Sequence, residues 1–415
     1  MTQKTRILIA GAGFAGIYTF KALKKLLRGN NEIEIFIMHP KNYFLFTPLL
    51  HEVTTGNQTL RNITEPIRKI LKGSNAHFVQ TKILGVSIPE KIIETEQGYY
   101  RYDYLVLSLG AQTNFYHTPG AKEHCFTLKS LEDAYRLKNQ FIDNFERASE
   151  TDDPEEKKKL LHFVVIGGGP TGVELAAEMA DFFYGTFSKY YTPDIIEATK
   201  ITIIQSHKTL VPQFPSNFHK RSFKRLKHEK IEIRLDCKVQ EVTENQVTLS
   251  NGEVISTATP IWVAGIEPQQ IPFDVEVEKN DKGQIKVGSD LSISNHPNIF
   301  VLGDMAEVND HKGSPLPATA QVATKQAFHT AQNILQCINN QPTLPFIYQS
   351  SGTLMSLGKF HALGKIANIP FSGFFAWWLW RTVYLFKIIS PAKRVQIAVD
   401  WTLHLFTERD ISRIE

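Results

Sequence analysis

The sequence is poor in cysteine, in net charge and in long apolar runs, and each shortage excludes a class of protein. It contains only three cysteines in 415 residues, Cys125, Cys237 and Cys337, and none of them shows a Cys-x-x-Cys pair or a zinc-ligand spacing. We therefore predict no metal site and no redox-active cysteine pair, and we interpret the thiols as reduced and structural. The net charge of +4 does not indicate a nucleic-acid partner.

No stretch of about 18 uncharged apolar residues occurs, so a membrane-spanning helix is not the first expectation. The opening residues, MTQKTRILIAGAG, give no sign of a signal peptide, because a strand begins by Arg6. We expect the cytoplasmic side of a cell, in a prokaryotic setting rather than an organelle. With 21% charged and 42% hydrophobic residues, the chain is typical of a globular protein, and its length indicates two or three domains.

What the sequence does have is a glycine pattern that occurs twice. In residues 5–23, TRILIAGAGFAGIYTFKAL, an apolar strand leads into Gly11, Gly13 and Gly16 and then into a helical pattern. The first glycine allows a tight turn, the second lets the backbone approach a pyrophosphate, and the third allows the helix to pack closely on the strand. The free N–H groups and the positive dipole end of the helix then face the phosphates.

The second copy lies in residues 160–180, LLHFVVIGGGPTGVELAAEMA. Here a strand over residues 163–166 precedes Gly167, Gly169 and Gly172, and a helix follows. One such turn alone is weak evidence, but two copies with the required strand and helix indicate two dinucleotides, commonly a flavin and a nicotinamide. We therefore predict an α/β protein with two Rossmann-like domains, each with a mainly parallel sheet.

Three further strand ends fit this prediction. Residues 296–308 form a strand that ends in Gly303-Asp304, where a carboxylate suits a ribityl or ribose hydroxyl. The strands before Gly110 and before Ala264-Gly265 each end in a turn of small residues. We interpret both turns as places where the chain leaves one nucleotide domain for the other.

Beyond the glycines, three stretches are more specific: NYFLFTPLLHEVTTG (residues 42–56), LPATAQVAT (residues 316–324) and SGFFAWWLWRTVYL (residues 372–385). With them, the chain resembles the type II NADH:quinone oxidoreductases, a family of two-dinucleotide-domain flavoproteins. The resemblance covers almost the whole chain. It implies a single-chain enzyme that carries FAD, takes a hydride from NADH and reduces a membrane quinone in a respiratory chain without pumping protons.

The resemblance also implies roles for individual residues. The FAD site comprises Gly11, Ala12, Gly13, Phe14, Ala15, Gly16, His39, Thr47, Pro48, Gly110, Asp304 and Ala320. The nicotinamide dinucleotide site comprises Gly167, Gly169, Pro170, Thr171, Gly172, Glu174, Gln205, Ala264 and Gly265. The catalytic candidates are Glu174, as a carboxylate relay for the protons that a quinone consumes, and Gln321 and Lys325, which form the quinone site. The alternative for Glu174 is a surface glutamate that the helix dipole favours.

Three positions depart from the expected pattern. Gln205 follows a strand at the place where an acid usually binds the ribose 2′-hydroxyl, so the enzyme either accepts NADPH as well, helped by His207 and Lys208, or still prefers NADH. His39 takes the corresponding place in the first unit, so the adenosine ribose of FAD needs another partner. Lys325 replaces the last Gln of the quinone motif Ala-Gln-x-Ala-x-Gln; it either stabilises a quinol anion or faces solvent.

The C-terminal part predicts attachment to a membrane surface. From residue 359 to residue 394 the chain has six Lys or Arg and no Asp or Glu, and the aromatic stretch FFAWWLWRTVYLFK lies within it. Such a segment is attracted to anionic headgroups, and aromatic side chains suit the interface. Residues 393–406 predict an amphipathic helix with Val395, Ala398, Trp401 and Leu405 on one face. The predicted attachment residues are Trp377, Trp378, Trp380, Arg381, Tyr384, Lys387 and Trp401.

Two alternatives for this segment stay open. A spanning helix would be interrupted by Pro370 and Gly373 and would place Arg381 well inside the bilayer, at about 2.5–3.5 kcal/mol. An exposed aromatic patch also suits a homodimer interface, which is compatible with surface attachment.

The predicted domains are residues 1–115 and 286–345 for FAD, residues 116–285 for NAD(P)H, and residues 346–415 for membrane attachment. Two other functions compete with the quinone reductase. A sulfide:quinone oxidoreductase requires a reactive cysteine pair at the flavin, which the three cysteines do not provide. A redox-sensing flavoprotein with little turnover requires neither a quinone motif nor a membrane segment.

Overall fold

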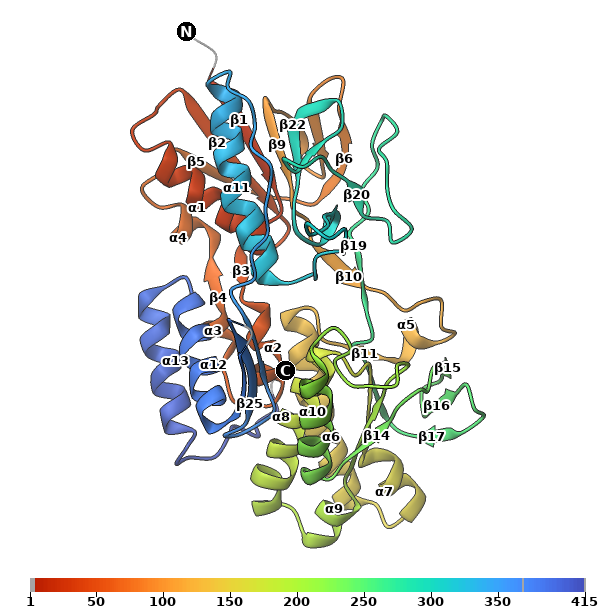
Figure 1. Ribbon diagram of the computed structural model, residues 1–415. Coiled ribbons are helices and arrows are strands. Elements are labelled where there is room, and N and C mark those ends of the chain that lie inside the picture. Colours follow the sequence, from red (N-terminus) through yellow and green to blue (C-terminus); the bar gives the residue numbers. More distant parts are fainter. Residues whose placement is uncertain (1–3, 368, 414–415) are drawn as a thin grey trace. The chain divides into compact units, whose positions relative to one another are not determined.

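The structure is a computed structural model that describes residues 4–367 and 369–413. It divides into two compact units, each assembled from separate stretches of the chain (Figure 1). Unit 1 comprises Met1–Leu45, Thr64–Gln112 and Ile266–Gln349; unit 2 comprises Phe46–Ile63, Thr113–Gly265 and Ser350–Glu415. The domain limits expected from the sequence stay a prediction, because compactness alone does not define a nucleotide-binding domain.

Unit 1 is built on a six-stranded sheet in the order β21-β22-β9-β1-β2-β5. Its strands are β1 (Thr5–Ala10), β2 (Ile33–His39), β5 (Ala76–Gln80), β9 (Tyr104–Leu107), β22 (His296–Val301) and the antiparallel edge strand β21 (Ser292–Ile293). The other neighbours pair in parallel. The central strands are apolar on both faces, as expected for a sheet covered on both sides. α1 (Phe14–Leu26) packs along α11 (Ala320–Ile338), and the other face meets a second, smaller sheet through Leu8, Leu105 and Ile93.

The remaining elements of unit 1 are short. They are β3 (Tyr43–Leu45), β4 (Thr64–Pro66), α4 (Ile67–Leu71), β6 (Ile83–Ser87), β7 (Ile92–Thr95), β8 (Gly98–Arg101), β19 (Ile266–Pro268), β20 (Ile285–Lys286), η4 (Gly303–Met305) and β23 (Ala306–Glu307). β6, β7 and β8 form the antiparallel second sheet. β10 (Ala111–Thr113) lies where the chain leaves unit 1 for unit 2.

Unit 2 is built on a five-stranded parallel sheet in the order β11-β18-β12-β13-β14. Its strands are β11 (Phe126–Thr127), β12 (His162–Ile166), β13 (Lys200–Ile204), β14 (Ile231–Arg234) and β18 (Thr259–Trp262). The main helices are α6 (Leu131–Glu150), α8 (Pro170–Ala180) and α10 (Ser216–His228). Between α6 and the sheet lies an aromatic core in which Phe145, Phe163 and Phe183 are fully buried.

The C-terminal stretch adds a third layer to unit 2. β24 (Thr353–Ser356), β25 (Ala362–Ile366) and β26 (Ile369–Gly373) form an antiparallel sheet, and α12 (Phe374–Lys387) and α13 (Pro391–Leu403) lie beside it (Figure 1). The other elements of unit 2 are η1 (Thr47–Leu49), α2 (Leu50–Thr54), α3 (Leu60–Ile63), α5 (Ala121–His124), α7 (Pro154–Leu160), the π-helical turn η2 (Asp181–Thr186), η3 (Phe187–Lys189), α9 (Pro193–Ala198), β15 (Val239–Val242), β16 (Gln246–Leu249) and β17 (Val254–Ser256).

The predicted α/β class is confirmed, and each glycine pattern lies between a parallel strand and a helix, as expected. The predicted C-terminal helix over residues 393–406 is observed as α13, which begins two residues earlier and ends at Leu403.

Candidate functional site

The first glycine turn, in unit 1, combines two crowded positions with one open position. Gly11 has φ +107°, and a Cβ atom there would lie 2.2 Å from the Ser108 carbonyl oxygen. A Cβ atom on Gly16 would lie 1.9 Å from the Gly11 carbonyl oxygen. A Cβ atom on Gly13 would meet nothing within 4 Å. Gly13 is also the N-cap of α1, so no N-cap side chain occupies the first N–H groups of the helix. This is the geometry that an anionic phosphate requires.

The Gly303-Asp304 turn closes against the same helix. A Cβ atom on Gly303 would lie 3.7 Å from Cβ of Ala15 and 3.8 Å from Cβ of Ala323, so η4, α1 and α11 meet here. The Gly303 N–H donates to Oε1 of Gln326 at 2.7 Å, and Gln326 is fully buried. Gln326 therefore sets the position of the turn that carries Asp304. This role of Gln326 was not predicted from the sequence.

The other predicted FAD residues have separate locations. His39 ends β2, and burial together with Lys41 lowers its pKa to about 4, so the imidazole is neutral. Gly110 has φ +76° and open space around it. Ala320 begins α11 after the N-cap Thr319, whose hydroxyl accepts the Val322 N–H at 3.3 Å. Thr47 and Pro48 lie in η1, which belongs to unit 2.

The second glycine turn, in unit 2, repeats the geometry of the first. Gly167 has φ +119° and packs against Ala264, whose Cα atom would lie 2.6 Å from an added Cβ. A Cβ atom on Gly172 would lie 1.9 Å from the Gly167 carbonyl oxygen, whereas Gly169 again has nothing within 4 Å. Gly169 caps α8 without a side-chain bond, and Pro170 begins the helix. Unit 2 thus offers a second uncapped helix N-terminus for a phosphate group.

The Gln205 side chain is turned into the loop that follows β13. Its Oε1 accepts the Gly168 N–H at 3.3 Å, and its Nε2 donates to the Thr209 carbonyl oxygen at 3.2 Å. The residue is only 6% exposed. A ribose at this strand end would therefore meet an amide that already has two backbone partners. The exposed side chains here belong to the next three residues, which include His207 and Lys208.

Glu174 lies in the first turns of α8 and accepts the Ser356 N–H at 3.0 Å through Oε1. Burial raises its pKa to about 8, and the negative charges of Glu178 and Glu52 act in the same direction. The side chain is therefore poised to hold or release a proton near neutral pH. This is the property that a proton relay requires, and it distinguishes Glu174 from a surface glutamate.

Glu174 is one member of an acidic cluster that the sequence analysis did not find. Glu178 and Asp181 follow it at four- and three-residue steps, so the three carboxylates lie on one side of the helix. Burial and the charge of Glu178 raise the pKa of Asp181, and the same two causes raise the pKa of Glu52 in α2. The spacing of three acids along an otherwise apolar helix could have indicated this cluster in the sequence.

Two arginines and a tryptophan from the C-terminal stretch complete this acidic cluster. Arg409 forms an ion pair with Glu178 at 2.9 Å, and the charge of Arg381 lowers the pKa of Glu52 against the effect of burial. The Trp401 indole N–H donates to Oε2 of Glu52 at 2.7 Å. Unit 2 therefore encloses a charged cluster of Glu52, Glu174, Glu178, Asp181, Arg381 and Arg409, which we call the buried charge cluster.

Tyr384 borders the buried charge cluster. Its ring stacks on Trp380 with a centroid distance of 4.7 Å and meets Phe46 edge-on at 6.2 Å. Burial and the nearby charge of Glu174 raise the pKa of the phenol, which keeps it protonated at neutral pH. Tyr384 is thus a half-buried, neutral hydroxyl beside Glu174, and its role as a lipid contact stays a prediction.

The two predicted quinone residues lie on α11 in unit 1. The Tyr348 hydroxyl donates to Oε1 of Gln321 at 2.6 Å. The Lys325 ammonium donates to the Gln349 carbonyl oxygen and lies 5.5 Å above the Tyr348 ring. Both side chains therefore hold the segment around Tyr348 against the helix. Lys325 is half-buried in this arrangement and does not extend freely into solvent.

Part of the membrane prediction needs correction. Trp377, Trp380 and Trp401 are 6%, 1% and 4% exposed, because they pack inside unit 2, where the Arg381 guanidinium lies 4.0 Å from the Trp377 ring and 5.0 Å from the Trp401 ring. They cannot contact lipid in this conformation. The expected apolar face of α13 also differs, since Trp401 is buried while Val395 is exposed.

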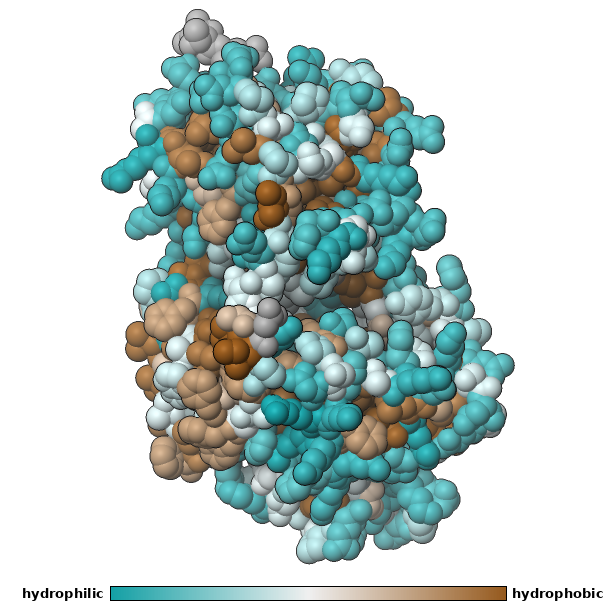
Figure 2. Space-filling view, in the orientation of Figure 1, coloured by the Kyte–Doolittle hydropathy of each residue, from teal (hydrophilic) through white to brown (hydrophobic). Residues whose placement is uncertain are grey.

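Other apolar side chains of this region do reach the surface. Trp378 is 52% exposed and Phe406 is 85% exposed. The full exposed set, which we call the apolar face, is Phe360, Ile366, Ile369, Phe374, Phe375, Trp378, Phe386, Val395, Val399, Leu403 and Phe406. Figure 2 shows brown and tan surface over α12 and α13. Lys387 is also exposed. In the part of the chain that the structure describes, no helix has the length and apolar character needed to cross a membrane.

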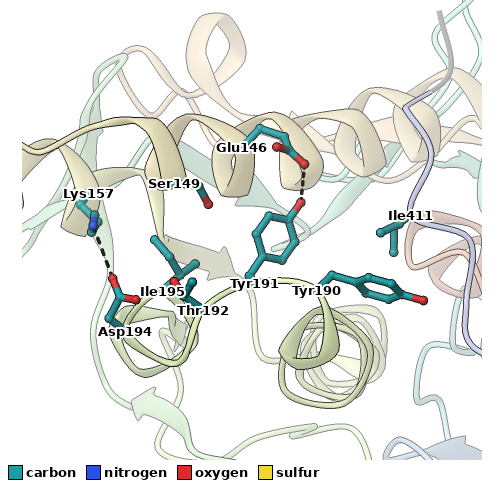
Figure 3. Close-up of a pocket in the computed structure, with 9 residues that line it drawn as sticks. All are labelled: Glu146, Ser149, Lys157, Tyr190, Tyr191, Thr192, Asp194, Ile195 and Ile411. Atoms are coloured by element: carbon teal, nitrogen blue, oxygen red, sulfur yellow. Dashed lines mark hydrogen bonds and ion pairs between the residues drawn. The ribbon is translucent and has the colours of Figure 1, made fainter.

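A cavity of about 350 Å³ opens elsewhere in unit 2, between α6, α7 and α9 (Figure 3). The Tyr191 hydroxyl points to Glu146 and donates to its Oε1 at 2.8 Å, and Lys157 pairs with Asp194 at 3.5 Å. Ile411 forms part of the wall. None of the predicted site residues lines this cavity, so it plays no part in the chemistry below.

Comparisons with known proteins show the family to which the chain belongs. The family model described as pyridine nucleotide-disulphide oxidoreductase matches residues 5–327, and that of the NDH2 C-terminal domain matches residues 351–410. A probable NADH dehydrogenase of Dictyostelium discoideum is 30% identical over 99% of this chain and 91% of its own. The type II NADH:quinone oxidoreductase of Mycobacterium tuberculosis is 29% identical over 98% of this chain and 89% of its own.

Solved structures share the fold. The structure of NDH2 from Plasmodium falciparum in complex with NADH superposes with a TM-score of 0.89 at 23% identity, covering 99% of this chain and 100% of the other. The sulfide:quinone oxidoreductase of Aquifex aeolicus reaches a TM-score of 0.73 at 18% identity, covering 92% of this chain and 90% of the other.

Proposed function

The chain belongs to the pyridine nucleotide-disulphide oxidoreductase family and carries the NDH2 C-terminal domain. On this basis we propose which of its residues bind FAD and NADH, which donate a proton and which attach the enzyme to a membrane surface. The chain is a type II NADH:quinone oxidoreductase that uses FAD and NADH. The observation that carries this assignment is the pair of open, uncapped helix N-termini at Gly13 and Gly169, one in each unit.

The first glycine turn fits FAD. Gly11 and Gly16 bring α1 close to its strand, Gly13 leaves room for the pyrophosphate, and Asp304 lies in a turn that Gln326 fixes. When bound there, FAD supplies the redox chemistry, since its ring system exchanges a hydride equivalent with a nicotinamide and electrons with a quinone. The protein positions the reactants and controls water and protons.

The second glycine turn fits the nicotinamide dinucleotide in the same way. Gly169 would receive the pyrophosphate of NADH, and Ala264 and Gly265 continue the floor of this turn after β18. A ribose at the end of β13 would lie near Lys208, and the exposed ammonium of this lysine would attract a 2′-phosphate. We therefore propose that NADPH is a second, weaker substrate.

One proton for quinone reduction comes from the chain itself. The hydride of NADH brings two electrons and one hydrogen, so conversion of a quinone to a quinol needs one further proton, and Glu174, with a pKa of about 8, carries one at neutral pH. The Ser356 N–H holds its carboxyl group in place. We assign Glu174 as the proton donor and Tyr384, which stays protonated beside it, as a neutral hydrogen-bond partner. Gln321 and Lys325 remain our candidates for quinone contact in unit 1.

The test is a spectrophotometric assay on purified protein in detergent. The flavin spectrum is recorded first, and NADH and NADPH oxidation are then followed with and without a short-chain quinone. Quinone-dependent turnover supports the proposal, and the ratio of the two rates measures the preference for NADH. A flavin that NADH bleaches and quinone cannot reoxidise would favour the redox-sensing alternative instead.

The cysteines argue against the sulfide:quinone alternative. Burial raises the pKa of Cys125 to about 12, so its thiol is not a nucleophile at neutral pH. Cys237 packs on the same apolar cluster, and Cys337 lies in α11 of unit 1. Among the described residues no disulfide is formed. The main assignment therefore stands over this one.

Attachment to a bilayer surface is the second part of the proposal. The apolar face provides exposed aromatic side chains such as Phe375 and Trp378, which suit the interface between headgroups and acyl chains. Replacing Phe375, Trp378 and Phe406 by Ser should release the protein from vesicles. Tyr190→Ser, at a residue that is 55% exposed outside this face, is the control. Equal binding by both variants would reject attachment through the apolar face.

We also propose that part of the apolar face serves a homodimer in detergent-free solution, since large exposed apolar patches commonly meet a partner. Sedimentation of the wild type and of the Phe375, Trp378 and Phe406 variant tests this. The cytoplasmic face of a prokaryotic membrane stays a prediction from the sequence.

A further inference from the structure

The outer side of α10 carries a row of lysines. The helix sequence SNFHKRSFKRLKH contains five Lys or Arg and no Asp or Glu. Phe218, Ser222 and Leu226 recur every four residues and face the core of unit 2. The opposite side carries Lys220, Lys224 and Lys227, all of which are exposed. The cationic character of this side is therefore a property of the whole helix and not of a single residue.

These lysines have no acidic counterpart. Glu229, the acid that follows the helix, forms an ion pair with Arg225 at 2.6 Å, and that pair is mostly buried. Within residues 4–367 and 369–413, no carboxylate forms an ion pair with Lys220, Lys224 or Lys227. A row of uncompensated charges on a folded surface fits an anionic partner, because nothing in the fold itself neutralises it.

α10 adjoins the C-terminal sheet and the apolar face. The Arg221 guanidinium donates to the Ser372 hydroxyl at 2.8 Å, and Ser372 lies two residues before the exposed Phe374. The Arg225 side chain reaches the Leu357 carbonyl oxygen at 3.5 Å. In Figure 2 the hydrophilic surface over α10 borders the tan and brown surface over α12. The lysine row and the apolar face therefore form one continuous surface of unit 2.

We propose that the outer side of α10 is a second membrane contact, which binds anionic lipid headgroups while the apolar face enters the interface. This rests on the attachment proposed above and extends it to an element outside the C-terminal domain. Two separate contacts, one apolar and one cationic, restrict how unit 2 is oriented on the bilayer, which a single patch does not. Membrane binding consequently depends on anionic lipid and weakens with salt.

The size of the effect follows from the charge. Each Lys or Arg at an anionic surface strengthens binding about fivefold, so the loss of three lysines should weaken it about a hundredfold. The test compares Lys220→Gln, Lys224→Gln and Lys227→Gln, combined in one protein, with the wild type. A matched control combines Lys122→Gln, Lys158→Gln and Lys238→Gln, which removes the same charge near α5, α7 and β15, on the other side of unit 2 (Figure 1).

Binding is measured by flotation of the full-length holoprotein with phosphatidylcholine vesicles, with and without 30% phosphatidylglycerol, at low and high salt. We expect the α10 variant to lose its preference for phosphatidylglycerol and its salt dependence, while the control variant behaves as the wild type. Equal loss in both variants, or none in either, would overturn the proposal. So would an α10 variant that binds both vesicle types normally but no longer binds a soluble polyanion such as heparin, since the partner would then not be lipid.

Failure of this inference can be told from failure of attachment itself. If the Phe375, Trp378 and Phe406 variant is released from all vesicles and the α10 variant is not, the apolar face alone anchors the protein. If neither is released, attachment through this surface is wrong altogether. Turnover with a short-chain quinone in detergent should be the same for the wild type and the α10 variant, because the lysine row lies outside the proposed sites. A lower turnover would mean that the substitutions disturb the sites.

Discussion

The Arg409 guanidinium lies 2.9 Å from the Glu178 carboxylate, and their side chains are only 11% and 5% exposed. The pair joins the C-terminal stretch to the last turn of α8, one turn after Glu174. Burying an ion pair this deeply removes both charged groups from water, which costs free energy. Losing one partner therefore leaves the other charge buried without a counter-charge, whereas losing both partners leaves no buried charge.

Arg409→Gln should therefore lower the free energy of unfolding by about 3–5 kcal/mol, since it leaves Glu178 buried and unpaired. The double variant Arg409→Gln with Glu178→Gln should recover much of this loss. Denaturant unfolding monitored by fluorescence measures both. The control is Arg413→Gln, because Arg413 pairs with Asp143 at 3.2 Å with 59% and 35% of the side chains exposed, and its loss should cost less than about 1 kcal/mol. A double variant no better than the single one would contradict the account.

Glu174→Gln should slow quinone reduction by at least about 100-fold and leave flavin reduction by NADH nearly unchanged. A glutamine keeps the hydrogen bond from Ser356 but cannot release a proton. Stopped-flow measurements separate the two half-reactions. Glu155→Gln, at an exposed glutamate of α7, is the control. If both half-reactions slow equally, Glu174 is not the proton donor.

Stability should fall as pH rises, and Glu174 should account for part of the slope. Its pKa rises from 4.5 to about 8 on folding, so the folded state keeps a proton that the unfolded state has lost. Its contribution is complete below pH 4.5 and is lost on the way to pH 8, by at most about 1.4 kcal/mol per pH unit. His51 titrates with the opposite sign below pH 6.5, because burial lowers its pKa to about 4. The free energy of unfolding of the wild type and of Glu174→Gln should therefore be compared between pH 6.5 and pH 8. Equal slopes against pH in the two proteins would refute the contribution of Glu174.

The two kinds of glycine in the first turn should behave differently. Gly16→Ala places a Cβ atom 1.9 Å from the Gly11 carbonyl oxygen, so it should destabilise the protein even without FAD. Gly13→Ala meets nothing within 4 Å and has an extended backbone, so the fold should survive while FAD affinity drops. Thermal unfolding of the apoprotein and the flavin content after purification measure the two effects. A normal flavin content in Gly13→Ala would argue against a phosphate at this helix N-terminus.

Lys208→Gln should raise the KM for NADPH about fivefold or more and leave the KM for NADH unchanged, because only NADPH offers a 2′-phosphate to the exposed ammonium. Gln205→Glu should also depress NADPH use, but at a cost in stability of about 1–3 kcal/mol, since the Thr209 carbonyl oxygen would lose its donor and face a carboxylate. An unchanged NADPH to NADH ratio in both variants would show that this strand end does not select the dinucleotide.

Much of the fold could be predicted because its signals are local. The glycine patterns around Gly13 and Gly169 lie within a few consecutive residues, and Gly16 and Gly172 each pack on a glycine five residues earlier. The strands before these turns are equally local. The burial of Trp380 could not be predicted, since aromatic residues occupy several sides of α12 and only tertiary packing decides which side faces outward. The contact between Trp401 and Glu52 could not be predicted either, because its partners are 349 residues apart. A sequence window detects periodicity but not such pairings.

The same distance in sequence has a consequence for how the protein folds. Unit 2 takes its residues from three separate stretches of the chain, and Glu52 and Glu178 find their partners, Trp401 and Arg409, only in the last of them. During synthesis Glu178 emerges from the ribosome 231 residues before its partner, and Glu52 emerges 349 residues before its partner. We expect late, slow closure around these acids, governed by long-range contacts, and we expect nascent chains that stop before residue 401 to depend on chaperones.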